Sequence, residues 1–208
     1  TGLERYGVQI ALTTMGPALN HRQREDLQGL PNVELHESTF KLEWMRDPWK
    51  DVDRAGQWLL DLERRVQPDL IHLNGYAHGA LPWASPVLVV AHSCVCSWFE
   101  AVRKCEPTAE WGEYRRRVDR GLRRADLVTA PTAAALDMLG RHYGRFQSAG
   151  PIYNGCDPVD GLAPSSEEVV FCAGRLWDPA KNIAMLDRAA AEVRWPVYAA
   201  GETTGPDG

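Results

Sequence analysis

One segment near the carboxyl end of the chain groups residues that could hold a phosphate. A strand-like run ends at Gly174, and Arg175 and Lys181 flank Asp178 and Pro179. Aspartate is a favoured helix N-cap and proline a favoured first helical residue, so we expect a helix to begin here. Free amides at a helix N-terminus, with two nearby cations, would cradle a diphosphate. From spacing alone, a well-capped surface helix with two solvated cations explains the segment equally well.

Polar residues or glycines also follow three other predicted strands. Ligands of open parallel sheets bind at the carboxyl ends of the strands, so these positions are candidate binding residues. They are Asn74-Gly75, His92-Ser93 and Asn154-Gly155. A histidine at such an edge could orient a sugar hydroxyl or share a proton. A hydrogen-bonded structural histidine and a simple tight turn are the alternatives for His92 and Asn74-Gly75.

Two further histidines lie near the same edge. His78 follows Asn74-Gly75 early in the next helical segment, and it could face the cleft. His72 lies inside its predicted strand, which favours a core residue with its hydrogen bonds satisfied.

The elements that would position these residues alternate along the chain. Short apolar runs with β-branched residues predict strands, and several are apolar on both faces, as buried parallel strands are. The predicted strands are Val8–Thr13, Val33–His36, Leu70–Leu73, Val87–Ala91, Leu127–Ala130, Val169–Cys172 and Val197–Ala200. Apolar residues at helical spacing lie between them: Val52, Ala55, Leu59, Leu62 and Val66; Trp111, Tyr114, Val118, Leu122 and Ala125; and Ile183, Leu186, Ala190 and Val193. This alternation predicts an α/β fold with a doubly wound parallel sheet.

The chain divides at a segment that lacks the hydrophobic periodicity of a helix or a strand. Residues 155–166 are rich in Gly, Pro, Asp and Ser and predict a linker. Residues 1–154 would form most of one Rossmann-like domain. Residues 167–208 supply only the first strand, helix and strand of a second domain, which is too little to cover a sheet alone.

A basic helix is predicted between Glu113 and Arg124. It carries six arginines and two acids, with Glu113–Arg117 and Asp119–Arg123 spaced for i, i+4 ion pairs. A solvated face is the first interpretation. The second is docking on an anionic membrane surface or acceptor.

Composition excludes several classes of function. The chain has 208 residues and a net charge of -5, which excludes a generally basic nucleic-acid binder. Five cysteines without metal-ligand spacing predict free thiols in a reducing cytoplasm and no metal site. Dinucleotide, P-loop and nucleophile-elbow motifs are absent.

Taken in order, five segments resemble GT-B retaining glycosyltransferases of family 4. They are PDLIHLNGYAHGALPW, PVLVVAHS, ADLVTAPTAAALDML, IYNGCDP and FCAGRLWDPAKNIAMLDRAA. In that family two Rossmann-like domains close on a nucleotide-sugar, and a sugar moves to an acceptor hydroxyl with retained configuration. The resemblance implies a cytoplasmic enzyme of hexosyltransferase type without a metal or other cofactor. It also implies a glycan, lipid or small-molecule acceptor. The net charge predicts no nucleic-acid partner, and the basic helix makes peripheral contact with the inner membrane face a further hypothesis.

The resemblance also implies roles for individual residues. Arg175 and Lys181 would hold the donor diphosphate and stabilise the leaving nucleoside diphosphate, and His92 would lie beside the transferred sugar. The remaining donor-side residues would be Gly174, Asn182, Asn154 and Gly155, and the acceptor-side cleft would include Asn74, Gly75, His78 and Ser93.

The chain departs from the family pattern at both ends. The family's first strand and glycine-rich loop would precede Thr1, and its Glu-x7-Glu element would follow Gly208. We therefore expect a fragment that is inactive on its own. The alternatives are a GT-B-like sugar-nucleotide epimerase or hydrolase, and a non-catalytic α/β module that binds a sugar or a protein.

Overall fold

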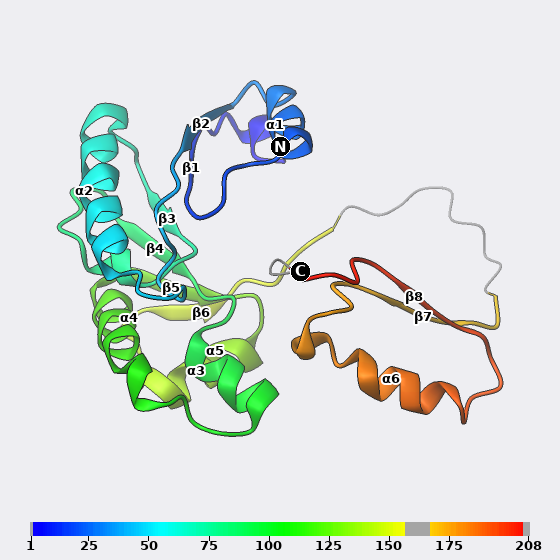
Figure 1. Cartoon of the computed structure of the whole chain (residues 1–208). Helices are drawn as coiled ribbons and strands as arrows, with labels where there is room; N and C mark the ends of the chain where they lie inside the picture. The colour runs from blue at the N-terminus through cyan, green and yellow to red at the C-terminus, as the bar shows by residue number, and fades with distance from the viewer. Residues whose placement is uncertain (1, 157–166, 206–208) are drawn as a thin grey trace. The chain divides into compact units, whose positions relative to one another are not determined.

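The structure, a computed structural model, describes residues 2–156 and 167–205 (Figure 1). From position 157 onward, the predicted linker 155–166 lies outside the described residues. The chain forms two compact units. The first contains Thr1–Val95 and Pro107–Tyr153, and the second contains Cys96–Glu106 and Asn154–Gly208.

Two parallel sheets form the first unit. Strands β3 (Ile71–Leu73), β4 (Val87–Val90), β5 (Leu127–Ala130) and β6 (Ala149–Pro151) make a four-stranded sheet in that order, whereas β1 (Ile10–Thr14) pairs only with β2 (Val33–Glu37). All the pairings are parallel, which confirms the α/β class with parallel strands. The sequence predicts no range for strand β6, although it places Asn154-Gly155 after a strand, because three residues containing Gly and Pro carry a weak strand signal.

Helices α2 (Trp49–Val66) and α4 (Gly112–Arg124) supply most of the core beside the four-stranded sheet (Figure 1). The predicted apolar stripes are buried within α2 and α4, except that Val66 at the last turn of α2 is 38% exposed, and Trp111 and Ala125 at the two ends of the α4 stripe are half-buried. The stripes face a sheet in which β4 is buried at alternate positions and β5 is buried at its last three residues. The buried core residues of these elements are Val52, Ala55, Leu59, Leu62, Val87, Val89, Tyr114, Val118, Leu122, Val128 and Ala130.

Two helices that sequence periodicity did not reveal begin at side-chain caps. Helix α1 (His21–Gln28) starts with a capping box, in which the Asn20 side chain accepts from the Gln23 N–H at 2.9 Å and the Gln23 side chain accepts from the Asn20 N–H. Helix α5 (Ala133–Tyr143) starts at Thr132, whose hydroxyl accepts from the Ala135 N–H. Shorter helical turns complete this unit: η1 (Glu4–Tyr6), η2 (Ala77–Ala80) and η4 (Ala109–Trp111).

Two glycines allow α4 to contact η2. A Cβ atom at Gly121 would lie 1.8 Å from the carbonyl oxygen of Tyr76, and one at Gly79 would lie 2.7 Å from the carbonyl oxygen of Gly121. Neither position therefore has space for a side chain. This contact fixes the turn that follows β3 against the basic helix.

Acidic side chains satisfy the backbone amides of the loops that enter the sheet. Glu63 of α2 is buried and accepts from the N–H groups of Ala84 and Ser85, both at 2.9 Å, just before β4. Asp126 accepts from the Val87 N–H at 2.7 Å. These bonds matter because a buried amide without a partner is costly.

The second unit contains the predicted strand, helix and strand. Strands β7 (Val170–Ala173) and β8 (Val197–Ala200) pair in parallel, and α6 (Ile183–Ala190) lies between them in sequence. The unit also includes η3 (Phe99–Arg103) and all of α3 (Val95–Trp98) except Val95, and η3 packs against η5 (Pro179–Lys181). At the end of β8, a Cβ atom at Gly201 would lie 1.7 Å from the Gly174 carbonyl oxygen.

Among the described residues, no helix combines the length and the apolar character that crossing a membrane requires.

Candidate functional site

The carboxyl ends of β3 and β4 bring two predicted site residues together. The Nε2 atom of His92 lies 3.3 Å from Oδ1 of Asn74, and both side chains are exposed. They are 18 residues apart in sequence but follow adjacent parallel strands. Because a carbonyl oxygen can only accept, Nε2 of His92 donates in this contact. The neutral imidazole then has Nδ1 free of hydrogen and able to accept from a hydroxyl.

A buried glutamate supports the loop that carries Asn74. Glu43 is only 8% exposed, and its carboxylate accepts from the N–H of Tyr76 at 3.1 Å and from that of Ala77 at 2.7 Å. Burial raises the pKa of Glu43, and the two amide bonds oppose this rise. Sequence analysis missed this residue because it lies in a segment without period, and its partners are 33 and 34 residues away.

Two buried tyrosines support the loop that carries His92. The Tyr76 hydroxyl donates to the Ser93 carbonyl at 2.8 Å, and the Tyr114 hydroxyl accepts from the Val95 N–H at 3.2 Å. Burial raises the pKa of both tyrosines, so both hydroxyl groups remain protonated at neutral pH. Ser93 thus contributes its carbonyl to the support of the loop, while the residue itself is exposed at the edge of the sheet.

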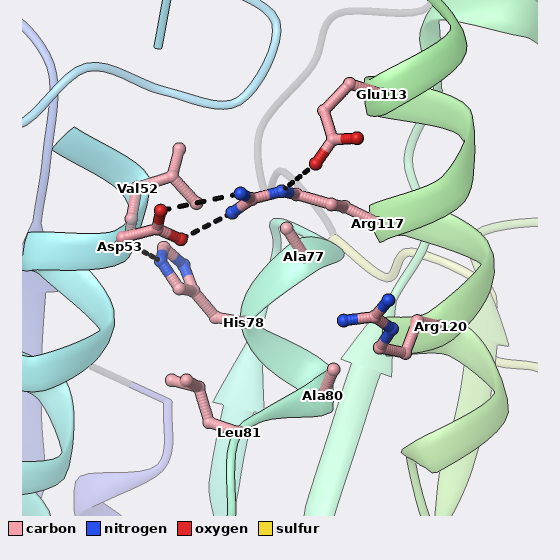
Figure 2. A pocket seen from close by; sticks show the side chains of 9 residues that line it. All are labelled: Val52, Asp53, Ala77, His78, Ala80, Leu81, Glu113, Arg117 and Arg120. Atoms are coloured by element: carbon pink, nitrogen blue, oxygen red, sulfur yellow. Dashed lines mark hydrogen bonds and ion pairs between the residues drawn. The ribbon is translucent and has the colours of Figure 1, made fainter. Parts of the chain in front are cut away.

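His78 lies in a separate pocket of about 300 Å³ among α2, η2 and α4 (Figure 2). It is 7% exposed, and its Nε2 donates to the Val52 carbonyl at 2.9 Å. Burial lowers the pKa of His78, which favours the neutral ring. Neither Asn74 nor His92 lines this pocket. His72, predicted as a core residue, is instead exposed, which corrects that expectation.

Several arginines on the basic face of α4 form ion pairs with nearby carboxylates. Both predicted i, i+4 pairs are present: Arg117 donates to Glu113 at 2.6 Å, and Arg123 donates to Asp119 at 2.9 Å. Arg117 also donates to Asp53 of α2, as Figure 2 shows. The solvated-face interpretation accounts for these pairs, and membrane docking stays a prediction.

The predicted cap at the phosphate segment is present in the second unit. Oδ1 of Asp178 accepts from the Ala180 N–H at 2.9 Å, with Pro179 at the first position. Oδ2 of Asp178 accepts from Nη2 of Arg175 at 2.6 Å, and this bond is the main reason why the pKa of Asp178 is lowered. The Arg175 guanidinium also lies 5.6 Å from the centre of the Trp177 ring. Asp178 therefore fixes both the turn and the arginine.

The turn is not the continuous helix start that the sequence predicted. Pro179–Lys181 form a single 3-10 turn, and Asn182 then adopts a left-handed conformation with φ 51° before α6 begins. The expectation of one helix from Pro179 is wrong, because Asn182 reverses the backbone. The methylene groups of Lys181 lie 3.7–3.9 Å from the position that a Cβ atom at Gly174 would take, so Lys181 lies beside Gly174.

The remaining predicted donor-side residues, Asn154 and Gly155, are exposed and precede the part of the linker that lies outside the described residues. In the described parts of the chain, no three His, Cys, Asp or Glu side chains gather in an arrangement that could hold a metal ion.

The raised pKa of Glu43 predicts a specific pH dependence. A carboxyl that holds its proton more tightly in the folded chain makes the free energy of unfolding fall as pH rises from about 4.5 through the raised pKa. We expect Glu43→Gln to remove this component. Urea unfolding of both proteins at several pH values measures it, and the contribution of His78 cancels in the difference. A difference that does not change with pH would contradict the assigned burial of Glu43.

A comparison with protein-family models agrees with the sequence resemblance. The model of the family described as Glycosyltransferase Family 4 matches residues 1–160. A crystal structure of Glycyrrhiza uralensis UGT73P12 with glycyrrhetinic acid 3-O-monoglucuronide is similar, with a TM-score of 0.48 and 11% identity. The match covers 98% of this chain but 59% of that one. No curated protein matches the chain.

Proposed function

Because the chain belongs to glycosyltransferase family 4, we propose that it is part of an enzyme that transfers a sugar from a nucleotide-sugar donor to an acceptor hydroxyl. The family match over residues 1–160 is the observation that carries this proposal. We further propose that the transfer retains the anomeric configuration and that the sugar is a hexose. The acceptor would be a glycan, a lipid or a small molecule.

Arg175 and Lys181 would bind the donor diphosphate. Both residues belong to the turn between β7 and α6, and the Asp178 carboxylate holds the Arg175 guanidinium in place. A guanidinium that is already oriented loses less conformational entropy when a phosphate binds. The two cations would stabilise the negative charge that builds up on the departing nucleoside diphosphate.

His92 would act on the sugar side of the reaction. Its Nε2–H donates to Asn74, which leaves Nδ1 as an acceptor for a sugar hydroxyl. This geometry suits the orientation of a hydroxyl better than strong base catalysis, since the ring is exposed at the edge of the sheet. Positioning and charge stabilisation would therefore supply most of the rate enhancement.

The stereochemistry of the product and the need for a metal test this proposal together. The complete protein that contains this chain is incubated with nucleotide-sugars and candidate acceptors, and the anomeric proton of early product is observed by NMR. We expect the product to keep the anomeric configuration of the donor. We also expect the transfer rate to be unchanged after treatment with EDTA, because Arg175 and Lys181 would provide the positive charge. An inverted product would contradict retention, and a rate abolished by EDTA and restored by Mg²⁺ would contradict the metal-free proposal.

A further inference from the structure

Glu43 reaches the edge of the four-stranded sheet from a distant part of the chain. It lies between β2 and α2, yet its carboxylate binds two consecutive amides of the turn after β3. Tyr76 is buried, and Ala77 begins η2. Without Glu43, both amides would lose the acceptor that the structure provides. Because an unmade bond at a buried amide is costly, the turn would have to move to find other partners.

The amides that Glu43 binds are next to the residue that contacts His92. Only Gly75 separates Asn74 from Tyr76, and because a glycine restricts its own backbone weakly, the position of Asn74 depends on how firmly the neighbouring residues are held. A carboxylate that fixes Tyr76 and Ala77 therefore also limits where the Asn74 side chain can lie. On the other side of the contact, the Tyr76 hydroxyl binds the carbonyl of Ser93, the residue after His92. Tyr76 thus links Glu43 to both loops.

We propose that Glu43 is a positioning residue that holds Asn74 against His92, so that Asn74 keeps the hydrogen of the neutral imidazole on Nε2. Glu43 acts through the backbone of Tyr76 and Ala77 and does not touch substrate. The inference rests on the proposed function only for its consequence in catalysis. The structural coupling from Glu43 to His92 holds for any chemistry at this edge of the sheet.

Glu63 provides a matched control within the same unit. Like Glu43, it is 8% exposed and accepts from two consecutive backbone amides, those of Ala84 and Ser85. Its loop enters β4, whereas the loop bound by Glu43 leaves β3. Strands β3 and β4 are parallel, so the two glutamates support opposite ends of the sheet. Loss of either should weaken folding, but only loss of Glu43 should alter the Asn74–His92 contact.

The test compares Glu43→Ala and Glu43→Gln with Glu63→Ala and Glu63→Gln, and uses Asn74→Ala as the reference for a lost contact. We expect the His92 ring signals in NMR spectra to move toward those of Asn74→Ala in Glu43→Ala, and partway in Glu43→Gln, which keeps one acceptor oxygen. Amide exchange at Tyr76 and Ala77 should accelerate about tenfold in Glu43→Ala. The glutamine variants provide the comparison if an alanine variant fails to fold.

The Glu63 variants should leave the His92 signals unchanged. Unmoved His92 signals in the Glu43 variants, or equal movement in both series, would overturn the proposal. In the transfer assay, Glu43→Gln should lower kcat more than Glu63→Gln at equal folded fraction. If no sugar transfer is found in the wild-type protein, the proposed function fails, while the NMR comparison still decides the role of Glu43.

Discussion

Replacing Arg175 with alanine in the complete enzyme should lower kcat about 100-fold, and Lys181→Ala should have an effect of similar size. Both cations belong to the turn after β7, where Asp178 holds the guanidinium and Lys181 lies beside Gly174. A charge that is fixed in advance stabilises a leaving diphosphate more in the transition state than in the ground state. The effect should therefore appear in kcat and in kcat/KM.

Steady-state kinetics with a saturating acceptor measures this effect. Arg188→Ala is the matched control, because Arg188 is an exposed arginine in the last turn of α6 of the same unit. It should leave kcat within a factor of about two, as expected for a surface substitution away from the site. Unchanged donor kinetics in both Arg175→Ala and Lys181→Ala would remove these residues from the donor site.

Gly121→Ala should lower the free energy of unfolding by about 3 kcal/mol or more. The new methyl group would lie 1.8 Å from the Tyr76 carbonyl oxygen, which is backbone and has no flexible end that could move away. To remove the overlap, α4 must separate from η2. The separation would open the buried contacts of Tyr114, Val118 and Leu122 with the core.

Gly140→Ala is the control, and we expect it to change the free energy of unfolding in the opposite direction. Gly140 is also a helical glycine of the first unit, in α5, but a Cβ atom there meets nothing within 4 Å. Alanine should stabilise this helix by about 0.5–1 kcal/mol, because glycine costs more backbone entropy. Urea unfolding of the two variants measures both values. Equal stability of Gly121→Ala and the wild type would contradict the close approach of α4 and η2.

The sequence predicted the features that depend on local pattern. Strands such as Leu127–Ala130, which is buried over its last three residues, and the apolar stripe of α2 follow from short-range periodicity, and the structure confirms both. The cap at Asp178 and the Glu113–Arg117 pair follow from fixed spacings of two and four residues. The parallel pairing of the strands was predicted because several strand segments are apolar on both faces.

Features that depend on distant contacts or on single backbone torsions could not be predicted. Nothing near Glu43 indicates that it will bind amides 33 and 34 residues away. The left-handed Asn182 breaks a segment whose composition predicts one helix. Likewise, no local signal shows that β1 and β2 pair apart from the four-stranded sheet. The candidate site thus combines strand ends that the sequence identifies with supports that only the fold reveals.

Calorimetry with UDP, GDP, ADP and dTDP tests the central claim most directly, because it asks whether the complete protein holds a nucleoside diphosphate through Arg175 and Lys181. We predict that at least one of these diphosphates binds with one molecule per chain. Its affinity should fall at least about tenfold in the Arg175→Ala Lys181→Ala double variant, as expected when charge-assisted bonds are lost. Absence of binding for all four, or an affinity that the double variant leaves unchanged, would contradict the account.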